Sequence, residues 1–303
     1  MAALADTIPA ARPTRAARPL TLTATDGVPL AALHHAPAGP ARGAVLIAAA
    51  MGVAQTFYQP LARWLAEAGF HALTFDLRGV GQSRAGSLRA VTTDVIGWAR
   101  TDATAAVRAL EDLAPGLPLT WLGHSLGGQL VPFVPDHRGL AQIITVAAGS
   151  GYWRDNSPAL RRKVWLLWFL AAPVATPLCG YFPGRALGMV GDLPRGVIRQ
   201  WRRWCLDPGY AVGAEGGAVE DLFARVTTPL TSISFTDDEM LSAASIDGLL
   251  TAYRGARQRR VRVTPAQLGV ERIGHFGLFR AAMAPAWARL VLPELAAVTP
   301  ARR

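Results

Sequence analysis

The stretch Gly123-His124-Ser125-Leu126-Gly127-Gly128 decides the fold that we expect for this chain. An apolar run precedes it at residues 118–122 and a helix-compatible segment follows it, which predicts a strand, a sharp turn and a helix. At such a turn Ser125 takes a positive φ, and a Cβ at position 123 or 127 would collide with the backbone. The turn therefore lifts the Ser125 hydroxyl out of the sheet and aims the N–H of Leu126 at the same space. Pro132 then limits the helix, which we expect to be short or kinked.

The composition indicates a large core. The chain has 303 residues, of which 51% are hydrophobic, enough for one large α/β domain with an insertion or for two small domains. The formal charge is +10, and Lys163 is the only lysine, so arginine carries almost all of the positive charge. Because the arginines are scattered rather than gathered in a stripe, we expect no nucleic-acid partner.

The chain contains two cysteines, Cys179 and Cys205. Neither lies in a CxxC pattern or beside the His and Cys neighbours that a metal site needs, so we expect no metal and no cofactor. We interpret both as free thiols in a reducing compartment, with a single disulfide as the alternative.

The ends of the chain and its most apolar run bear on location. Residues 1–19 are rich in Ala, Arg and Pro without a continuous apolar region, so we expect a disordered tail over residues 1–18 and no secretory signal. The apolar run 164–178 contains Pro173 and Pro177 and is shorter than the ~20 residues of a membrane span. We therefore expect a soluble, cytoplasmic protein with no transmembrane segment.

Strand and helix patterns alternate along most of the chain, which is typical of a parallel sheet. Asp26-Gly27 predicts a hairpin turn at the edge of the sheet, and Thr93 or Asp94 can cap a long helix that runs to about residue 113. Strands are predicted at residues 43–50, 70–75, 118–122, 142–148, 229–235 and 259–264. Of these, 43–50 and 142–148 are apolar enough to be buried in a parallel sheet.

This alternation breaks between residues 151 and 226, which hold five of the nine tryptophans and no strand-like run. We expect a helical insertion there, between core segments 19–150 and 227–303. Its first helix should begin at Ser157-Pro158 and its second should be capped by Asp192. The run 164–170 is apolar all round, so it must be covered on several sides, by plain core packing, by an apolar ligand or by a partner.

A serine hydroxyl needs a base within hydrogen-bond reach, and that base needs an orienting acid. Among six histidines, only His275 lies in a loop just past a late strand, whereas His124 beside the serine suits a structural or pocket role. The acid should follow strand 229–235, and we favour Asp238 over Asp237. These acidic residues could instead form a solvated turn or a weak cation site.

Four motifs together resemble the α/β-hydrolase superfamily, particularly its lidded lipase/esterase and serine-aminopeptidase-like members. They are Gly-His-Ser-Leu-Gly-Gly at 123–128, Asp-Leu-Arg-Gly-Val-Gly-Gln-Ser at 76–83, Asp238 after its strand and Gly-His-Phe at 274–276. The resemblance spans residues 19–298. It implies an eight-stranded, mostly parallel sheet with a helical lid inserted after strand 6, in which Ser125 is the nucleophile, Asp238 the acid and His275 the base.

The chain departs from the resemblance at the predicted oxyanion hole. Many relatives have His-Gly after the third strand, where this chain has Ala49-Ala50-Met51-Gly52. The donor is a backbone N–H, so we assign Met51 together with Leu126 and keep Gly52 as the alternative to Met51. The residues that we expect to line the substrate pocket are Gly52, His124, Tyr152, Trp153, Trp165 and Trp168.

The resemblance implies a serine hydrolase that cleaves a small-molecule carboxylic ester (EC 3.1.1) or thioester through an acyl-enzyme on Ser125. The apolar acyl group would lie under the Trp-rich lid. Two alternatives remain open, an acyltransferase with the same triad and a non-catalytic protein that binds an apolar ligand. The basic lid favours neutral or anionic substrates, and the oligomeric state is left open.

Overall fold

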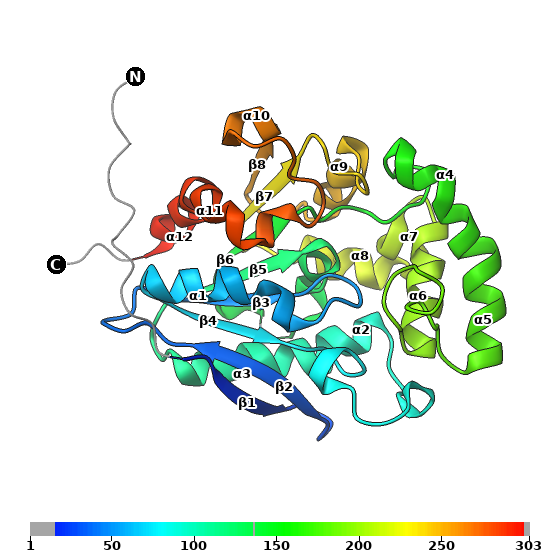
Figure 1. Cartoon of the computed structure of the whole chain (residues 1–303), viewed down its shortest axis with the longest axis horizontal. Coiled ribbons are helices and arrows are strands. Elements are labelled where there is room, and N and C mark those ends of the chain that lie inside the picture. Colours follow the sequence, from blue (N-terminus) through cyan, green and yellow to red (C-terminus); the bar gives the residue numbers. More distant parts are fainter. Residues whose placement is uncertain (1–15, 136, 300–303) are drawn as a thin grey trace.

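One eight-stranded sheet runs through the computed structural model, which describes residues 16–135 and 137–299 (Figure 1). The strand order is β1-β2-β4-β3-β5-β6-β7-β8. Strand β2 is antiparallel to both its neighbours, and the six strands from β4 to β8 in this order run parallel to one another. This confirms the predicted eight-stranded, mostly parallel sheet. The strands are β1 (Arg18–Thr23), β2 (Pro29–His35), β3 (Gly43–Ala48), β4 (Phe70–Phe75), β5 (Leu119–His124), β6 (Leu140–Val146), β7 (Leu230–Phe235) and β8 (Gln258–Val263).

Helices cover both faces of this sheet and fill the segment between β6 and β7. Asp94 caps the long helix predicted before β5, which contains a π-helical segment at Trp98–Ala103. The helices are α1 (Gln59–Glu67), α2 (Val95–Gly97), α3 (Thr104–Leu113), α4 (Pro158–Leu166), α5 (Ala172–Cys179), α6 (Arg195–Leu206), α7 (Tyr210–Glu215), α8 (Gly217–Ala224), α9 (Ala243–Ala252), α10 (Pro265–Leu268), α11 (Ala284–Leu290) and α12 (Leu292–Val298).

The sheet divides the core in two because successive side chains of a strand point to opposite faces. Val45 and Ile47 of β3 belong to the core cluster that includes residues of α1, α11 and α12, whereas Leu46 belongs to the cluster that includes residues of α3 and of the insertion. All six residues of β3 are buried, as predicted for a central parallel strand.

The N-terminal prediction is only partly within the described residues. The expected tail covers residues 1–18, of which 1–15 lie outside the described part. Arg18 is already the first residue of β1 and pairs with His34 across the sheet edge. The ordered core therefore begins at Arg18 at the latest.

The segment between β6 and β7 is helical, with α4 and α5 joined by a π-helical segment at Leu167–Ala171 (Figure 1). Ser157 caps α4 as predicted, accepting a hydrogen bond from the Leu160 amide at 3.2 Å. The prediction that Asp192 caps the next helix is wrong. Helix α6 begins at Arg195, while the Asp192 carboxylate accepts from the Arg185 amide and pairs with Arg84.

Both cysteines, Cys179 and Cys205, are free. In the described part of the chain, no single helix is long and apolar enough to cross a membrane; one bent pair, Ala281–Leu290 with Leu292–Val298, passes that test of length and composition when taken together.

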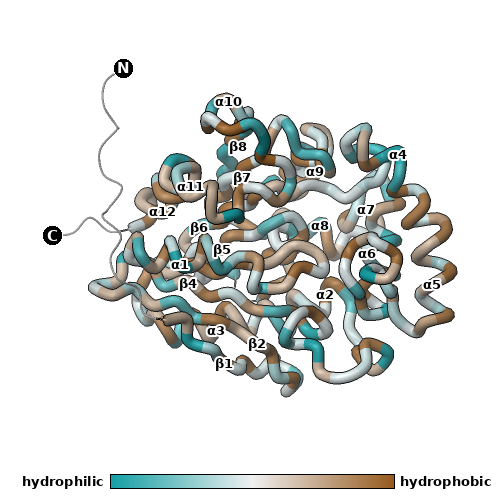
Figure 2. Tube along the Cα trace, viewed as in Figure 1, coloured by the Kyte–Doolittle hydropathy of each residue, from teal (hydrophilic) through white to brown (hydrophobic). Residues whose placement is uncertain are grey.

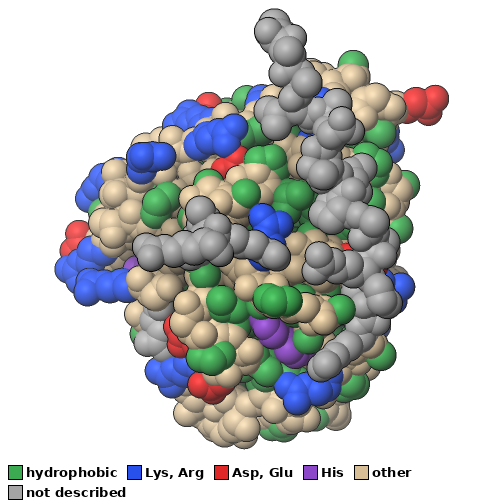
Figure 3. Space-filling view, turned by 90° about the vertical axis from the view of Figure 1, so that its left-hand side faces the viewer, with side chains coloured by type: hydrophobic (Ala, Val, Ile, Leu, Met, Phe, Trp, Pro, Cys, Tyr) green, Lys and Arg blue, Asp and Glu red, His purple; other side chains and the backbone are tan. Residues whose placement is uncertain are grey.

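A histidine pair lies where the carboxyl end of β2 meets the amino-terminal end of β4, and histidine side chains are visible on this face in Figure 3. His34 Nε2 lies 2.9 Å from His71 Nδ1, and the two rings stack. Burial, reinforced by the charge that His71 would carry, lowers the pKa of His34 to about 4. The pair is therefore neutral near pH 7, with one ring donating to the other.

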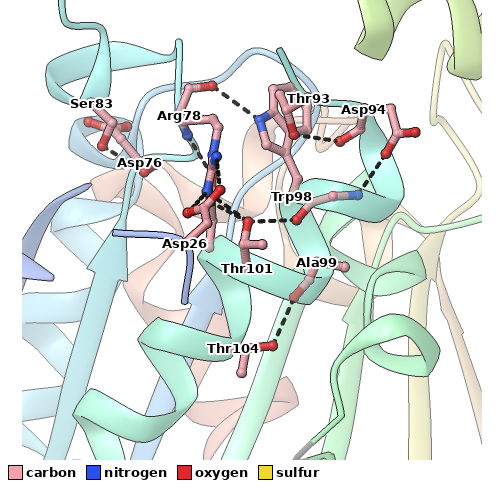
Figure 4. Close-up of polar contacts among 12 residues, drawn as sticks. Asp26, Asp76, Arg78, Ser83, Thr93, Asp94, Trp98, Ala99, Thr101 and Thr104 are labelled. Carbon is pink, nitrogen blue, oxygen red and sulfur yellow. Dashed lines mark hydrogen bonds and ion pairs between the residues drawn. The ribbon is translucent and has the colours of Figure 1, made fainter. Parts of the chain in front are cut away.

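The glycine-rich turn 76–83 is built around its own aspartate, Asp76 (Figure 4). The Asp76 carboxylate accepts from the amides of Gln55 and Gln82, and a Cβ on Gly81 would overlap it. Burial raises the pKa of Asp76, although these amides oppose the shift. The amides that could hold an anion are thus already used.

A buried ionic cluster joins this turn to the helix that precedes β5 (Figure 4). The Arg78 guanidinium donates from Nε to Asp102 at 2.8 Å and makes a two-point contact with Asp26. Asp102 has no exposed surface and also accepts from the Arg78 amide and from Thr101. The Asp102 carboxylate thereby accepts hydrogen bonds from the guanidinium of Arg78, which is almost fully buried.

We expect Asp102→Ala to lower the free energy of unfolding by about 3–5 kcal/mol, because it leaves the buried Arg78 charge without its principal partner. The matched control is Asp221→Ala, which removes one member of an exposed pair with Arg225 and should cost less than about 1 kcal/mol. Urea denaturation of both variants measures the difference. Equal losses would contradict the importance of the buried cluster.

Candidate active site

The turn after β5 forces Ser125 into a left-handed conformation with φ of 50°. Two glycines make this possible, as predicted. A Cβ on Gly123 would lie 2.5 Å from the backbone of Gly127, and one on Gly127 would overlap the carbonyl of Ala48. Ser125 is partly exposed, whereas the residues on either side of it are buried. The strain is thus confined to the residue that reaches solvent.

Side chains from the core hold the backbone that follows Ser125. Trp121 Nε1 donates to the Gly127 carbonyl and the Tyr253 hydroxyl to the Gly128 carbonyl, both at 2.9 Å. In place of the predicted helix, residues Ser125–Gln129 and Val131–Phe133 form two short 3-10 turns, because Pro132 cannot continue an α-helix.

His275 and Asp238 are brought together from two loops. His275 Nδ1 lies 2.9 Å from Asp238 Oδ2, and both side chains are buried. The other carboxylate oxygen, Oδ1, accepts from the amides of Met240 and Leu241. When Nδ1–H donates to this carboxylate, Nε2 is the basic nitrogen of the neutral ring.

The two acids left open by the sequence have different partners in the structure. Asp237 Oδ2 accepts from the amides of Ile273 and Gly274, at 2.7 and 3.1 Å. Asp237 therefore fixes the backbone before His275, whereas Asp238 contacts its ring.

Glu239, which the sequence did not single out for a role of its own, also holds this loop. Its carboxylate accepts from the His275 amide at 3.0 Å. A Cβ on Gly274 would lie 2.6 Å from the same carboxylate, and Gly274 has φ of 63°. A glycine is therefore needed for the loop to approach Glu239.

A buried hydrogen-bond chain connects the loop after β3 with the loop of His275. The Ala50 amide donates to the Tyr58 hydroxyl at 2.9 Å, and the hydroxyl donates to His124 Nδ1 at 2.8 Å. His124 Nε2 in turn donates to the His275 carbonyl at 3.0 Å. Burial, then the nearby His275, lowers the pKa of His124 well below its ordinary value, so this ring stays neutral and holds one tautomer. His124 thus has the structural role that the sequence allowed, whereas Tyr58 was missed because no motif marks it.

The predicted oxyanion donors, Met51 and Leu126, lie in the segments that follow the neighbouring strands β3 and β5. Ala48 of β3 pairs with Gly123 of β5, so Met51 and Leu126 each follow three residues after this pair. The close approach of Gly127 to Ala48 brings the two loops together. Gly52, the alternative donor, has φ of 69° and packs against Gly191 of the insertion.

The aromatic residues predicted for the pocket are only partly gathered. Tyr152 and Trp153 are half-buried beyond β6. Trp168 is buried and packs edge-on against Trp201, with ring centroids 4.8 Å apart. Trp165 is 49% exposed on the outer side of the insertion, and its indole donates to the Arg162 carbonyl. Trp165 therefore does not lie with the other aromatic residues predicted for the pocket.

No group of three or more His, Cys, Asp or Glu side chains able to hold a metal ion occurs within residues 16–135 and 137–299.

Comparison with known proteins shows what this chain resembles. A family model described as serine aminopeptidase, S33, matches residues 39–177, less than half of the chain. No curated protein matches the sequence.

Among solved structures, a soluble variant of monoglyceride lipase from Saccharomyces cerevisiae, in complex with a substrate analog, is similar to the whole chain over its own whole length, with a TM-score of 0.69 and 16% identity. An esterase from Pyrococcus furiosus has a TM-score of 0.56 and 13% identity, covering 93% of this chain and 92% of its own. A thioesterase domain from the curacin biosynthetic pathway has a TM-score of 0.55 and 16% identity, and the match covers 92% of this chain and 100% of that domain. The chain has the fold of these α/β hydrolases.

We expect Tyr58→Phe to lower the free energy of unfolding by about 1–3 kcal/mol, because it leaves the buried His124 Nδ1 without its donor and the Ala50 amide without its acceptor. The control is Tyr181→Phe, at a half-buried tyrosine of the insertion, which should change stability by less than about 0.5 kcal/mol. Thermal and urea unfolding measure both. A neutral Tyr58→Phe variant would show that the chain of hydrogen bonds contributes nothing to the fold.

Proposed function

We propose that this chain, which has the α/β-hydrolase fold, is a serine hydrolase that cleaves a carboxylic ester or thioester through an acyl-enzyme on Ser125. The observation that carries the proposal is the contact between Asp238 and His275, and Ser125 lies on a strained turn. His275 also lies against His124, the residue before Ser125, with ring centroids 5.1 Å apart.

In this proposal His275 Nε2 takes the proton of the Ser125 hydroxyl as the oxygen attacks the carbonyl carbon of the substrate. The C–O or C–S bond to the leaving group then breaks, and the imidazolium returns its proton to the departing alcohol or thiol. A water molecule, deprotonated by the same ring, attacks the acyl-enzyme and releases the acid and free Ser125. Asp238 keeps the ring in the tautomer that has its lone pair on Nε2.

The negative charge on the carbonyl oxygen would be held by the amides of Met51 and Leu126. Removing one such donor typically lowers turnover by about 10²–10³-fold. The hydrogen bond from the Ala50 amide to Tyr58 and the contact of Gly127 with Ala48 support this arrangement, because they fix the loop that carries Met51.

We assign an apolar acyl group to the substrate, with the helical insertion between β6 and β7 acting as its lid. Residues 151–210 of the insertion contain nine Lys and Arg but three Asp and Glu, which suits a neutral or anionic substrate better than a free amino terminus. The lipase and thioesterase neighbours support an ester or thioester rather than a peptide bond.

We expect Ser125→Ala and Asp238→Asn each to lower kcat/KM by about 10⁴-fold or more on a p-nitrophenyl ester or an acyl thioester. Asp237→Asn is the matched control. It neutralises the neighbouring acid, whose side-chain oxygen can still accept from the Ile273 and Gly274 amides, so we expect a loss below about tenfold.

Steady-state kinetics on a panel of esters, thioesters and amides with all three variants measure these effects. If Ser125→Ala retains wild-type activity, the proposed nucleophile is wrong. If the two aspartate variants lose activity equally, the special role of Asp238 is contradicted.

A further inference from the structure

The insertion exposes an apolar surface that the core does not use. Six of the seven most exposed large apolar side chains in the described residues lie on the helical path from α4 through α5. Their exposed fractions run from 39% at Leu166 to 79% at Leu178. In Figure 2 this path lies at the outer edge of the molecule and is strongly hydrophobic along α5. The exposed members are Trp165, Leu166, Phe169, Leu170, Val174 and Leu178.

With the exposed Pro173 and Pro177, these side chains form adjacent pairs that recur every four residues. The pairs are 165/166, 169/170, 173/174 and 177/178. A regular helix has 3.6 residues per turn, so a four-residue repeat would drift around its axis. The π-helical segment Leu167–Ala171 has a wider turn, which offsets part of that drift. The opposite side, with Val164, Trp168 and Thr176, is buried. The outer apolar residues therefore form one continuous face, which we call the outer face.

Cations without acidic partners border the outer face. The sequence from residue 156 to 191 contains no Asp or Glu, and Arg161, Arg162 and Lys163 are exposed at its beginning. Within the described part of the chain, none of these three side chains forms an ion pair with a carboxylate. Elsewhere on the surface several arginines, such as Arg260 with Asp247, do form such pairs.

A small pocket of about 220 Å³ opens between α5 and α6 beside the outer face. It is lined by Pro173 and Pro177 of the outer face and by Arg199 and Arg202 of α6. Thr176 also lines it, and the buried Oγ1 of Thr176 has no hydrogen-bond partner among the described residues. The positive charge around the outer face thus continues along its second side.

We propose that the outer face docks on a lipid bilayer that carries anionic headgroups. The apolar side chains enter the boundary between headgroups and acyl chains, and the bordering cations contact lipid phosphates. Trp165 and the long Arg and Lys side chains suit this boundary, because each combines an apolar body with a polar tip. The inference does not rest on the proposed catalytic chemistry.

The charge around the outer face favours an anionic bilayer over a second copy of the chain as its partner. Two copies that share the outer face would bring together surfaces that carry cations and no anions, on chains with a formal charge of +10. An anionic bilayer complements the same surface and needs no opposing pattern of side chains.

The experiment is co-sedimentation of the full chain with vesicles of phosphatidylcholine alone or mixed with phosphatidylglycerol, at low and high salt. We expect binding to the mixed vesicles that weakens as salt rises. Leu170→Ser with Leu178→Ser should weaken it at least about tenfold, because two apolar anchors are lost. The control, Leu187→Ser, makes the same change at a 43% exposed leucine outside the outer face and should leave binding unchanged.

Replacing Arg161, Arg162 and Lys163 together by Gln should weaken binding to mixed vesicles about a hundredfold, or about fivefold per charge, and reduce the salt dependence. Thermal unfolding of each variant, expected to match wild type, verifies folding. Absence of vesicle binding, or equal binding by the Leu170→Ser/Leu178→Ser variant and the control, overturns the proposal. So does a lipid-free dimer in analytical ultracentrifugation that this double variant dissociates, because a second copy would then occupy the outer face.

Discussion

The close approach of two backbones at the ends of β3 and β5 is the constraint on which the site depends. Gly127 lies so near the Ala48 carbonyl that no side chain fits between them, and Gly123 is equally confined by the turn itself. Within this space Ser125 adopts a positive φ, and the end of β3 lies against Gly127. Tyr58 and His124 then link the loop after β3 to the carbonyl of His275. The proposed nucleophile, base and oxyanion donors are thus positioned by contacts among the ends of parallel strands.

Much of this arrangement could be predicted because it depends on local sequence. Glycines two residues before and after a serine specify the turn, and continuous apolar runs specify the buried strands. The choice of His275 followed from its place after the last strand, since the carboxyl ends of parallel strands share one edge of the sheet. Local sequence could not separate Asp237 from Asp238, because adjacent side chains point in different directions and only the loop conformation decides which one meets the ring.

The features that could not be predicted from the sequence depend on contacts between segments that are far apart in the chain. Tyr58 and Glu239 hold the site through hydrogen bonds to loops far along the chain, and neither belongs to a motif. The expected cap at Asp192 failed because Pro194 holds the N-cap position of α6, while Arg84, 108 residues away in the chain, pairs with the aspartate. The apolar run of the insertion was expected to be covered on several sides. In the structure only the inner side of this run is buried against the rest of the protein. The π-helical segment keeps the remaining apolar side chains aligned on the outer face.

In the proposed mechanism Ser125 carries the acyl group during turnover, and this intermediate can be trapped. The chain would be mixed with a slowly deacylating ester, quenched in acid, digested and analysed by mass spectrometry. We expect one added acyl group on the peptide that contains Ser125, formed by wild type and absent from Ser125→Ala. An acyl group on another residue, or hydrolysis by wild type with no acylated peptide at any time, would contradict this mechanism.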